Sequence, residues 1–231
     1  MALTTTRRPW WQRVLRNAVW FSVIGYAWGI LHDIAARRGT PRVKPFFMTA
    51  MIAGHMAATY RLLRYTPRLG MPRALRVLAV VLAPLSWAAM FYSIFVEIPL
   101  RKAWLEQGHT DELVTTGTYA LARHPGVIWF TFAIVFTALA TRSKRLLLAA
   151  PVMVAGDVGH VAFQDRYVLP EVFGDAYERY QGTTPFLVPT PRSFRRFVGT
   201  MPGRRVSDTA FRDELPEDVR DDAAGWERPA N

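Results

Sequence analysis

Five long apolar runs occupy most of the first 165 residues and limit the folds that this chain can adopt. The runs extend over Ala18 to Leu31, Phe46 to Tyr60, Val77 to Leu100, Val127 to Ala140, and Leu146 to Phe163. A bilayer-spanning helix needs about 20 apolar residues, and three of the runs reach only about 14 or 15. Flanking Trp, Tyr and Arg side chains can extend such runs to the membrane interface. We therefore predict an all-α, multi-pass integral membrane protein with about five transmembrane helices.

A soluble helical bundle is the main alternative to this interpretation. Helices on the surface of a soluble bundle carry one polar face, and several of the five runs lack one. The chain has 231 residues, of which 51% are hydrophobic, so its length is enough for one sizeable domain and short for two. The absence of Cys excludes disulfides and thiolate metal sites.

The formal net charge of +11 raises the question of nucleic-acid binding. The basic residues, however, lie in the connections between the apolar runs, at Arg37, Arg38, Arg42 and Lys44, at Arg61, Arg64, Arg68, Arg73 and Arg76, and at Arg142, Lys144 and Arg145. Positions at the ends of apolar runs suit anionic lipid headgroups. We predict membrane lipids as partners and no nucleic acid. Because successive connections carry similar numbers of basic residues, charge alone does not set the orientation.

Composition divides the chain into three parts. Residues 1–17 form a basic leader, for which an interfacial helix and an unstructured basic segment remain alternatives. No convincing signal-peptide cleavage site follows, so we expect the first apolar run to be retained. Residues 18–190 form the membrane domain. Residues 191–231 are a polar tail, which we predict to be flexible, with a lid or a partner-binding segment as the alternative.

Two polar blocks lie beside apolar runs, where ionisable groups are costly unless they line a site. The first block, Leu113 to Pro125, reads LVTTGTYALARHP, and the second, Asp165 to Tyr180, reads DRYVLPEVFGDAYERY. Pro125 is well placed to begin a helix. Arg123 and His124 then precede a helix start, where free backbone N–H groups favour an anion such as a carboxylate or phosphate.

The last apolar run carries polar residues at helical spacing. Asp157, His160 and Gln164 fall at i, i+3 and i+7, so we expect them along one face that points into the bundle or a wet cavity. A hydrogen-bond network that only fixes helix packing is the alternative. For His55 and Glu97, taken singly, we predict structural pairing.

Together the two blocks resemble the isoprenylcysteine carboxyl methyltransferase and phospholipid methyltransferase superfamily of integral membrane enzymes. The resemblance covers about residues 77 to 190. The matching residues are Leu113, Val114, Gly117, Tyr119, Arg123, His124, Pro125, Leu169, Phe173, Gly174, Tyr177 and Tyr180. It implies transfer of a methyl group from S-adenosyl-L-methionine to a lipophilic acceptor. It also implies a C-terminal cytosolic segment that closes over a cofactor site facing the cytoplasm.

The resemblance further implies roles for individual residues. The cofactor site would be lined by Glu112, Leu113, Val114, Tyr119, His124, Pro125, Val127 and Asp165. An aromatic ring such as that of Tyr119 can attract a sulfonium cation. Asp165 can pair with the cofactor's ammonium group, and Arg123 and His124 can hold its carboxylate. The catalytic candidates are therefore His124, Arg123 and Asp165.

Three positions depart from the superfamily pattern. Val127 stands where the pattern has Tyr, Arg166 replaces the second of two acids, and Val161, beside His160, stands where enzymes that methylate prenylcysteine carry Arg. These differences argue against a prenylcysteine acceptor. Two alternatives remain open: a related membrane reductase that uses NADPH, and a non-catalytic membrane interaction protein that retains the fold.

Overall fold

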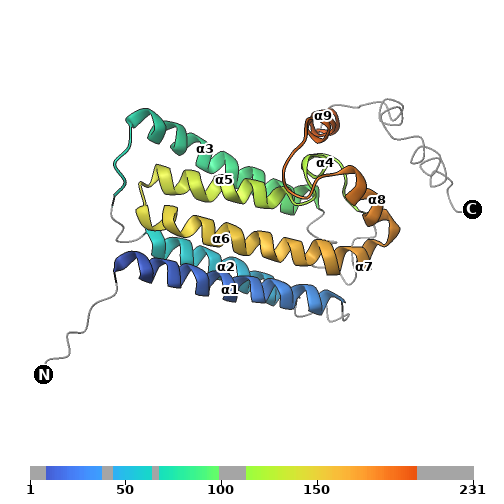
Figure 1. The fold of residues 1–231 in the computed structure, drawn as a ribbon, viewed down its shortest axis with the longest axis horizontal. Coiled ribbons are helices and arrows are strands. Elements are labelled where there is room, and N and C mark those ends of the chain that lie inside the picture. The colour runs from blue at the N-terminus through green and yellow to red at the C-terminus, as the bar shows by residue number, and fades with distance from the viewer. Residues whose placement is uncertain (1–8, 38–43, 64–67, 99–112, 202–231) are drawn as a thin grey trace, which may run out of the picture.

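The computed structural model describes residues 9–37, 44–63, 68–98 and 113–201 (Figure 1). Four of the five apolar runs lie within helices, and the third run is helical from Val77 to Glu97. The long helices are α1 (Trp10–Arg37), α2 (Lys44–Leu63), α3 (Arg73–Tyr92), α5 (Pro125–Ala140) and α6 (Lys144–Phe163). The described residues contain no β-strand, only an isolated bridge between Arg68 and Ser143. The predicted all-α class is confirmed.

Three helical segments are long and apolar enough to cross a membrane. They are Trp10–Ile34, Arg73–Glu97 and Lys144–Phe173. Pro125–Ala140 is also apolar but shorter, with 16 residues. Transmembrane helices are thus supported by length and composition, for three of the five predicted spans.

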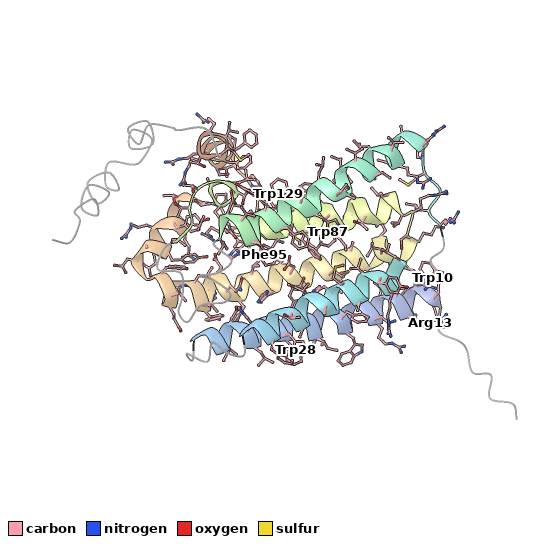
Figure 2. The ribbon with its side chains drawn as sticks, turned by 180° about the vertical axis from the view of Figure 1, so that it is seen from behind. Trp10, Arg13, Trp28, Trp87, Phe95 and Trp129 are labelled. Carbon is pink, nitrogen blue, oxygen red and sulfur yellow. The ribbon has the colours of Figure 1, made fainter. Side chains whose placement is uncertain are left out.

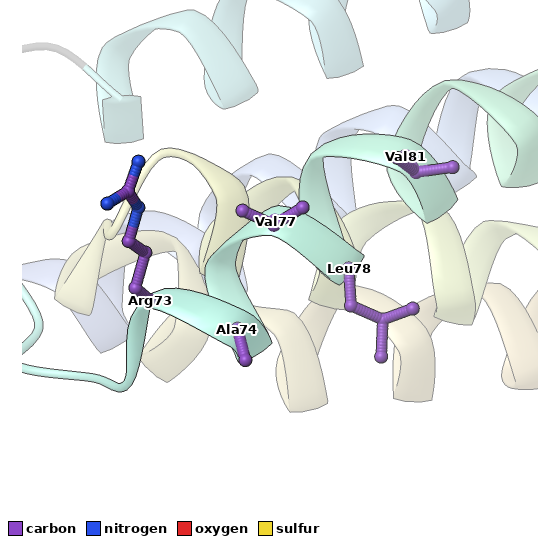
Figure 3. Close-up of a pocket in the computed structure, with 5 residues that line it drawn as sticks. All are labelled: Arg73, Ala74, Val77, Leu78 and Val81. Atoms are coloured by element: carbon purple, nitrogen blue, oxygen red, sulfur yellow. The ribbon is translucent and has the colours of Figure 1, made fainter.

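Many large apolar side chains point outward from this bundle, and several small ones are fully buried in its interior. Val77, Leu78 and Val81 of α3 are each more than half exposed, and Figure 3 shows them along a shallow apolar hollow on the outer side of the helix. The fully buried interior positions include Ala133, Ala138, Ala149 and Ala79. Small residues let helices approach closely, as they do in membrane bundles, and the outward apolar side chains suit lipid contact. Trp28 and Trp87, on different helices, are among the aromatic side chains shown in Figure 2.

The helices alternate in direction along the chain. At one end Arg76 of α3 donates a hydrogen bond to Ala140 at the end of α5, and at the other end Ile94 lies beside Gly126 near the start of α5. The two helices are therefore antiparallel. In contrast, α1 and α6 run in the same direction, since Tyr26 contacts Met153 and Asp33 contacts His160.

A tight turn joins α5 to α6. Arg142 has a positive φ of 58°, which ends α5, and the amides of Arg142 and Ser143 donate to carbonyls in its last turn. The Ser143 hydroxyl then accepts the Leu146 amide and caps the start of α6. The Arg142 side chain donates to the Leu69 carbonyl at 2.7 Å, which ties this turn to the segment before α3.

Short helices gather at the opposite end of the bundle. They are α4 (Thr118–Leu121), α7 (Leu169–Phe173), α8 (Asp175–Thr183) and α9 (Pro191–Thr200) (Figure 1). At this same end α3 and α6 each widen into a π-helical turn, at Ser93–Glu97 and Gln164–Val168. Such wide turns occur often at functional sites, because they redirect side chains out of the regular helical register.

The ends of the membrane domain differ from the composition-based divisions. Trp10–Arg37 is one continuous helix, so the last eight residues of the predicted leader are the first turns of α1. Residues 191–200 of the predicted flexible tail form α9, which begins with a capping box between Thr190 and Ser193. Residues 1–8 and 202–231, which carry the rest of those two predictions, lie outside the described residues.

Candidate functional site

Asp165 is the centre of a buried hydrogen-bond network at the end of α6. Its Oδ1 lies 3.1 Å from His124 Nε2 and accepts the Tyr177 hydroxyl at 2.5 Å. Its Oδ2 accepts from Arg123 Nη2 at 3.2 Å and from Gln181 Nε2 at 3.1 Å. The structure therefore brings together the three predicted catalytic candidates, although Asp165 follows Arg123 and His124 by about forty residues in the sequence.

Arg123 is held in place by the segment that follows α8. Its guanidinium donates to the Gln181 carbonyl at 3.0 Å, and its backbone amide donates to the Pro185 carbonyl at 2.9 Å. The ring of Phe186 lies against both the guanidinium, at 5.8 Å, and the His124 imidazole, at 5.2 Å. The segment after the second block, with Pro185 and Phe186, thus covers Arg123 and His124 of the first block.

Local backbone features explain why these side chains meet. Pro125 begins α5, which leaves His124 as its N-cap residue in a non-helical conformation. Asp165 is the second residue of the π-helical turn that follows α6. Gly174, with φ 54°, reverses the chain between α7 and α8 so that Tyr177 returns to Asp165.

Burial controls the protonation of the groups around Asp165. Burial lowers the pKa of His124 below its usual 6.5, although the bond to Asp165 acts in the opposite direction. The imidazole is therefore neutral near pH 7. Burial and the Asp165 carboxylate together raise the pKa of the Tyr177 phenol. Burial likewise raises the pKa of Tyr180, whose hydroxyl donates to the Tyr119 carbonyl at 2.7 Å.

A small cavity of about 170 Å³ lies at the same end of the bundle, between the end of α3 and the start of α4. Its lining residues are Tyr92, Glu97, Val114, Thr116, Gly117 and Thr200. The Glu97 carboxylate accepts hydrogen bonds from both the amide and the hydroxyl of Thr118. The predicted structural pairing of Glu97 is therefore present, although its partner lies in the first polar block.

The other residues expected to line a cofactor site have varied positions. Val114 lines the cavity, and Tyr119 donates its hydroxyl to the Ser93 carbonyl at 3.3 Å. Pro125 and Val127 are buried in the first turn of α5, and Leu113 is partly buried; none of these three lines the cavity. Glu112 lies outside the described residues.

Sequence reasoning missed two partners of the site. Gln181 donates to Asp165, and Thr200 of α9 accepts the Gly117 amide at 2.9 Å. Neither residue gives a signal in a single sequence, because an isolated Gln or Thr on a short helix has no distinctive pattern. Tyr177 was visible only as a matching position of the motif, without an assigned task.

A second polar cluster ties α1 to α6 inside the bundle. Asp33 accepts from Gln164 at 3.0 Å and lies 3.1 Å from His160 Nε2, while His32 Nδ1 lies 3.2 Å from its other oxygen. The expected common face of His160 and Gln164 is thus directed at a single carboxylate. Asp33 was not identified from the sequence as a partner of these residues. It is the only acid in α1, and that feature could have singled it out.

The fold and the site define an all-helical bundle with membrane-compatible helices and a buried Asp–His–Arg network at one end. Comparison of the chain with models of known protein families, with curated proteins and with solved structures found no match.

The donor set of the site suits a zwitterionic amino acid group, such as the methionine part of S-adenosylmethionine. Asp165 offers a carboxylate and Arg123 a guanidinium, 3.0 Å apart between Oδ1 and Nε. The described cavity is smaller than the roughly 300–1,000 Å³ of most ligand sites, and neither Arg123 nor Asp165 lines it. The charges of the donor set match those of the amino acid group, whereas the described cavity does not hold the whole cofactor.

Proposed function

We propose that this protein transfers a methyl group from S-adenosylmethionine to a lipophilic acceptor at the membrane surface. The observation that carries the proposal is the convergence of Arg123, His124 and Asp165 within hydrogen-bonding distance. These residues come from the two blocks that resemble the membrane methyltransferase superfamily. The cofactor supplies an electrophilic methyl group on a sulfonium, and the roles below are those of the protein.

Asp165 and Arg123 are the proposed holders of the cofactor's amino acid group. A zwitterion carries both charges, so it can insert between the paired side chains and give each a new partner of opposite sign. Neither buried charge is then left without a partner of opposite sign. An unpaired buried charge would cost several kcal/mol. Gln181 and Tyr177 also donate to Asp165 and would keep its carboxylate oriented while Arg123 moves.

His124 is the proposed base where the acceptor has a proton to lose. Its neutral imidazole can take a proton from an amine, thiol or hydroxyl, whereas a carboxylate acceptor needs no base. Tyr119 is the proposed aromatic wall for the sulfonium, because its ring is fixed through the Ser93 carbonyl. Alignment of acceptor and methyl group in a water-poor cleft then provides most of the rate enhancement.

We also propose that all five long helices cross the membrane. The three segments with span-like composition, in α1, α3 and α6, enter from the same end of the bundle, so α2 and α5 have to return the chain across it. The end with the site would face the cytoplasm, where the cofactor is made.

A non-catalytic membrane interaction protein is the second candidate. One observation favours it: Asp165 is already paired with four side-chain donors, which leaves its carboxylate fully satisfied without a ligand. The two candidates differ in a single measurable property, namely saturable binding of the cofactor.

Binding of labelled S-adenosylmethionine to the full chain in lipid nanodiscs tests the proposal. We expect saturable binding that Asp165→Asn weakens about tenfold to a hundredfold, as loss of a charged hydrogen-bond acceptor predicts. The matched control is Asp175→Asn, because Asp175 is an exposed acid on neighbouring α8. Folding of each variant is checked by circular dichroism and by its Tm.

The outcomes separate the alternatives. Absence of saturable binding at millimolar cofactor would reject methyl transfer and leave the non-catalytic role. Stabilisation by NADPH and not by S-adenosylmethionine would indicate the reductase alternative. If binding is found, mass spectrometry of lipid extracts incubated with methyl-labelled cofactor identifies the acceptor.

A further inference from the structure

Helix α9 is amphipathic, but its polar face is the one that contacts the protein. Ser193, Arg196 and Thr200 recur at i, i+3 and i+7 and form this inner face. Ser193 is 1% exposed, Arg196 donates to the Thr183 carbonyl and the Thr184 hydroxyl, and Thr200 accepts the Gly117 amide. The hydrogen bonds of Arg196 and Thr200 therefore help to hold α9 to the bundle.

Two apolar side chains of the α9 segment point away from the protein. Phe194 is 55% and Met201 39% exposed, whereas Phe197, which lies between them in an i, i+3, i+7 series, is partly buried. Val188, just before the helix, is 78% exposed. A helix on a water-soluble surface has the opposite arrangement, so this face requires an apolar environment of its own.

The placement of α9 matches a position at a membrane interface. Figure 1 shows α9 nearly end-on while the long helices run across the view, so α9 lies crosswise to them at the end of the bundle that holds the site. If the long helices stand in the membrane, α9 lies along its surface. Arg192 and Arg195 are exposed on the same helix, beside Phe194.

We propose that α9 is an interfacial helix that docks on anionic phospholipid headgroups. Phe194, Met201 and Val188 enter the boundary between headgroups and acyl chains, and Arg192 and Arg195 contact lipid phosphates. Apolar insertion combined with basic side chains is the arrangement of surface-bound amphipathic helices, whose binding depends on anionic lipid. Through the bond from Gly117 to Thr200, docking also holds α4 and the wall of the cavity.

Site-directed spin labelling tests this docking, and the absence of Cys from the chain makes each label position unique. The full chain with Phe194→Cys, carrying a nitroxide, is placed in nanodiscs with and without phosphatidylglycerol. Accessibility to oxygen and to a water-soluble nickel chelate gives the depth of the label. In anionic nanodiscs we expect an oxygen-accessible, nickel-protected label about 5–10 Å below the headgroups.

Two controls define the comparison. Glu178→Cys places the label on an exposed acidic position of α8 and should remain nickel-accessible in every lipid. Arg195→Gln, added to Phe194→Cys, should move the label toward water in anionic nanodiscs, as should replacement of phosphatidylglycerol by phosphatidylcholine.

Three results would overturn the proposal. The first is a label at 194 as nickel-accessible as that at 178 in anionic nanodiscs. The second is a label protected from both reagents, which would mean that protein covers this face. The third is a depth that is independent of lipid charge. No cofactor is present in the experiment, so its outcome is separate from that of the methyl-transfer test.

Discussion

Gly117 has a backbone conformation that other residues cannot adopt without strain. Its φ is 60°, and a Cβ at this position would overlap the Glu97 carboxylate. Gly117→Ala should therefore lower the free energy of unfolding by more than the roughly 1–3 kcal/mol of a strained backbone alone, because the Glu97 to Thr118 bonds are also displaced. Chemical unfolding in detergent measures the change.

Substitutions at two other glycines distinguish the cost of backbone strain from the cost of a steric clash. Gly174 has φ 54° and open space around the position that a Cβ would take, so Gly174→Ala should cost only the strain of about 1–3 kcal/mol. Gly182 has ordinary helical geometry and the same open space, so Gly182→Ala should stabilise the protein by about 0.5–1 kcal/mol. Equal effects at 117 and 174 would show that Glu97 yields without cost.

His124 links stability to pH. Its pKa is lower in the folded protein than the usual 6.5, mainly through burial, so the unfolded chain binds more protons below that pH. The free energy of unfolding should therefore fall as pH decreases from about 7 through 6.5 toward the folded pKa. Arg123 and His160 add to this by opposing a charge on the imidazole.

His124→Gln isolates this contribution, because the Gln amide can still donate to Asp165 but does not titrate. We expect the variant to lose less stability than the wild type between pH 7.5 and 5.5, measured as the change in Tm in detergent. Parallel pH profiles for the two proteins would show that His124 is not buried in its neutral form. The other ionisable groups are present in both proteins, so the comparison isolates position 124.

At the level of single residues, the sequence predicts that Arg123, His124 and Asp165 belong to one site, but it does not predict the other side chains that bond there. Arg123 and His124 precede a proline helix start, and Asp165 is an acid at the end of an apolar run, so each is visible locally. Asp165 lies in the π-helical turn at Gln164–Val168, which has no recognisable pattern in a single sequence. Gln181 and Thr200 reach the site through chain reversals, so their roles depend on tertiary structure.

At the level of elements, the five apolar runs predict the five long helices, because a continuous apolar segment suits a helix in a bilayer or in a bundle core. The short helices α7, α8 and α9 are less visible, since their ends depend on local features such as Gly174 and the Thr190 cap. The predicted tail began at residue 191 because composition turns polar there. In α9, however, the polar residues make the protein contacts, and composition alone does not reveal this inversion.

Close approach of α1 and α6 depends on one glycine. A Cβ on Gly156 would lie 2.6 Å from Tyr26 Cε2 and 3.1 Å from Ser22 Cβ, whereas Gly159 on the same helix has open space. Gly156→Ala should reduce the free energy of unfolding by about 1–3 kcal/mol through overpacking. Gly159→Ala should leave it unchanged or slightly raised. Unfolding curves in detergent measure both, and equal effects would mean that α1 can move aside.

For the whole molecule, the order of the helices makes a stronger case for membrane topology than hydropathy does. Three of the described helical segments are long and apolar enough to cross a membrane, and α2 and α5 do not meet the same criterion of length and apolar character. Yet α3 and α5 are antiparallel neighbours, with Arg76 bonded to Ala140 at one end and Ile94 beside Gly126 at the other. A chain that crosses in α3 and again in the same direction in α6 has to cross back between them.

This connectivity predicts that the two ends of the bundle lie on opposite sides of the membrane. Thr141, in the turn between α5 and α6, and Glu178, on α8 beside the site, are both exposed. In a chain without native Cys, Thr141→Cys and Glu178→Cys should react with a membrane-impermeant maleimide from opposite faces of sealed vesicles. Glu178→Cys should react from the cytoplasmic face, since the proposed cofactor reaches the site there. Labelling of both positions from one face would mean that α5 does not cross, and that the bundle lies in the membrane in another way.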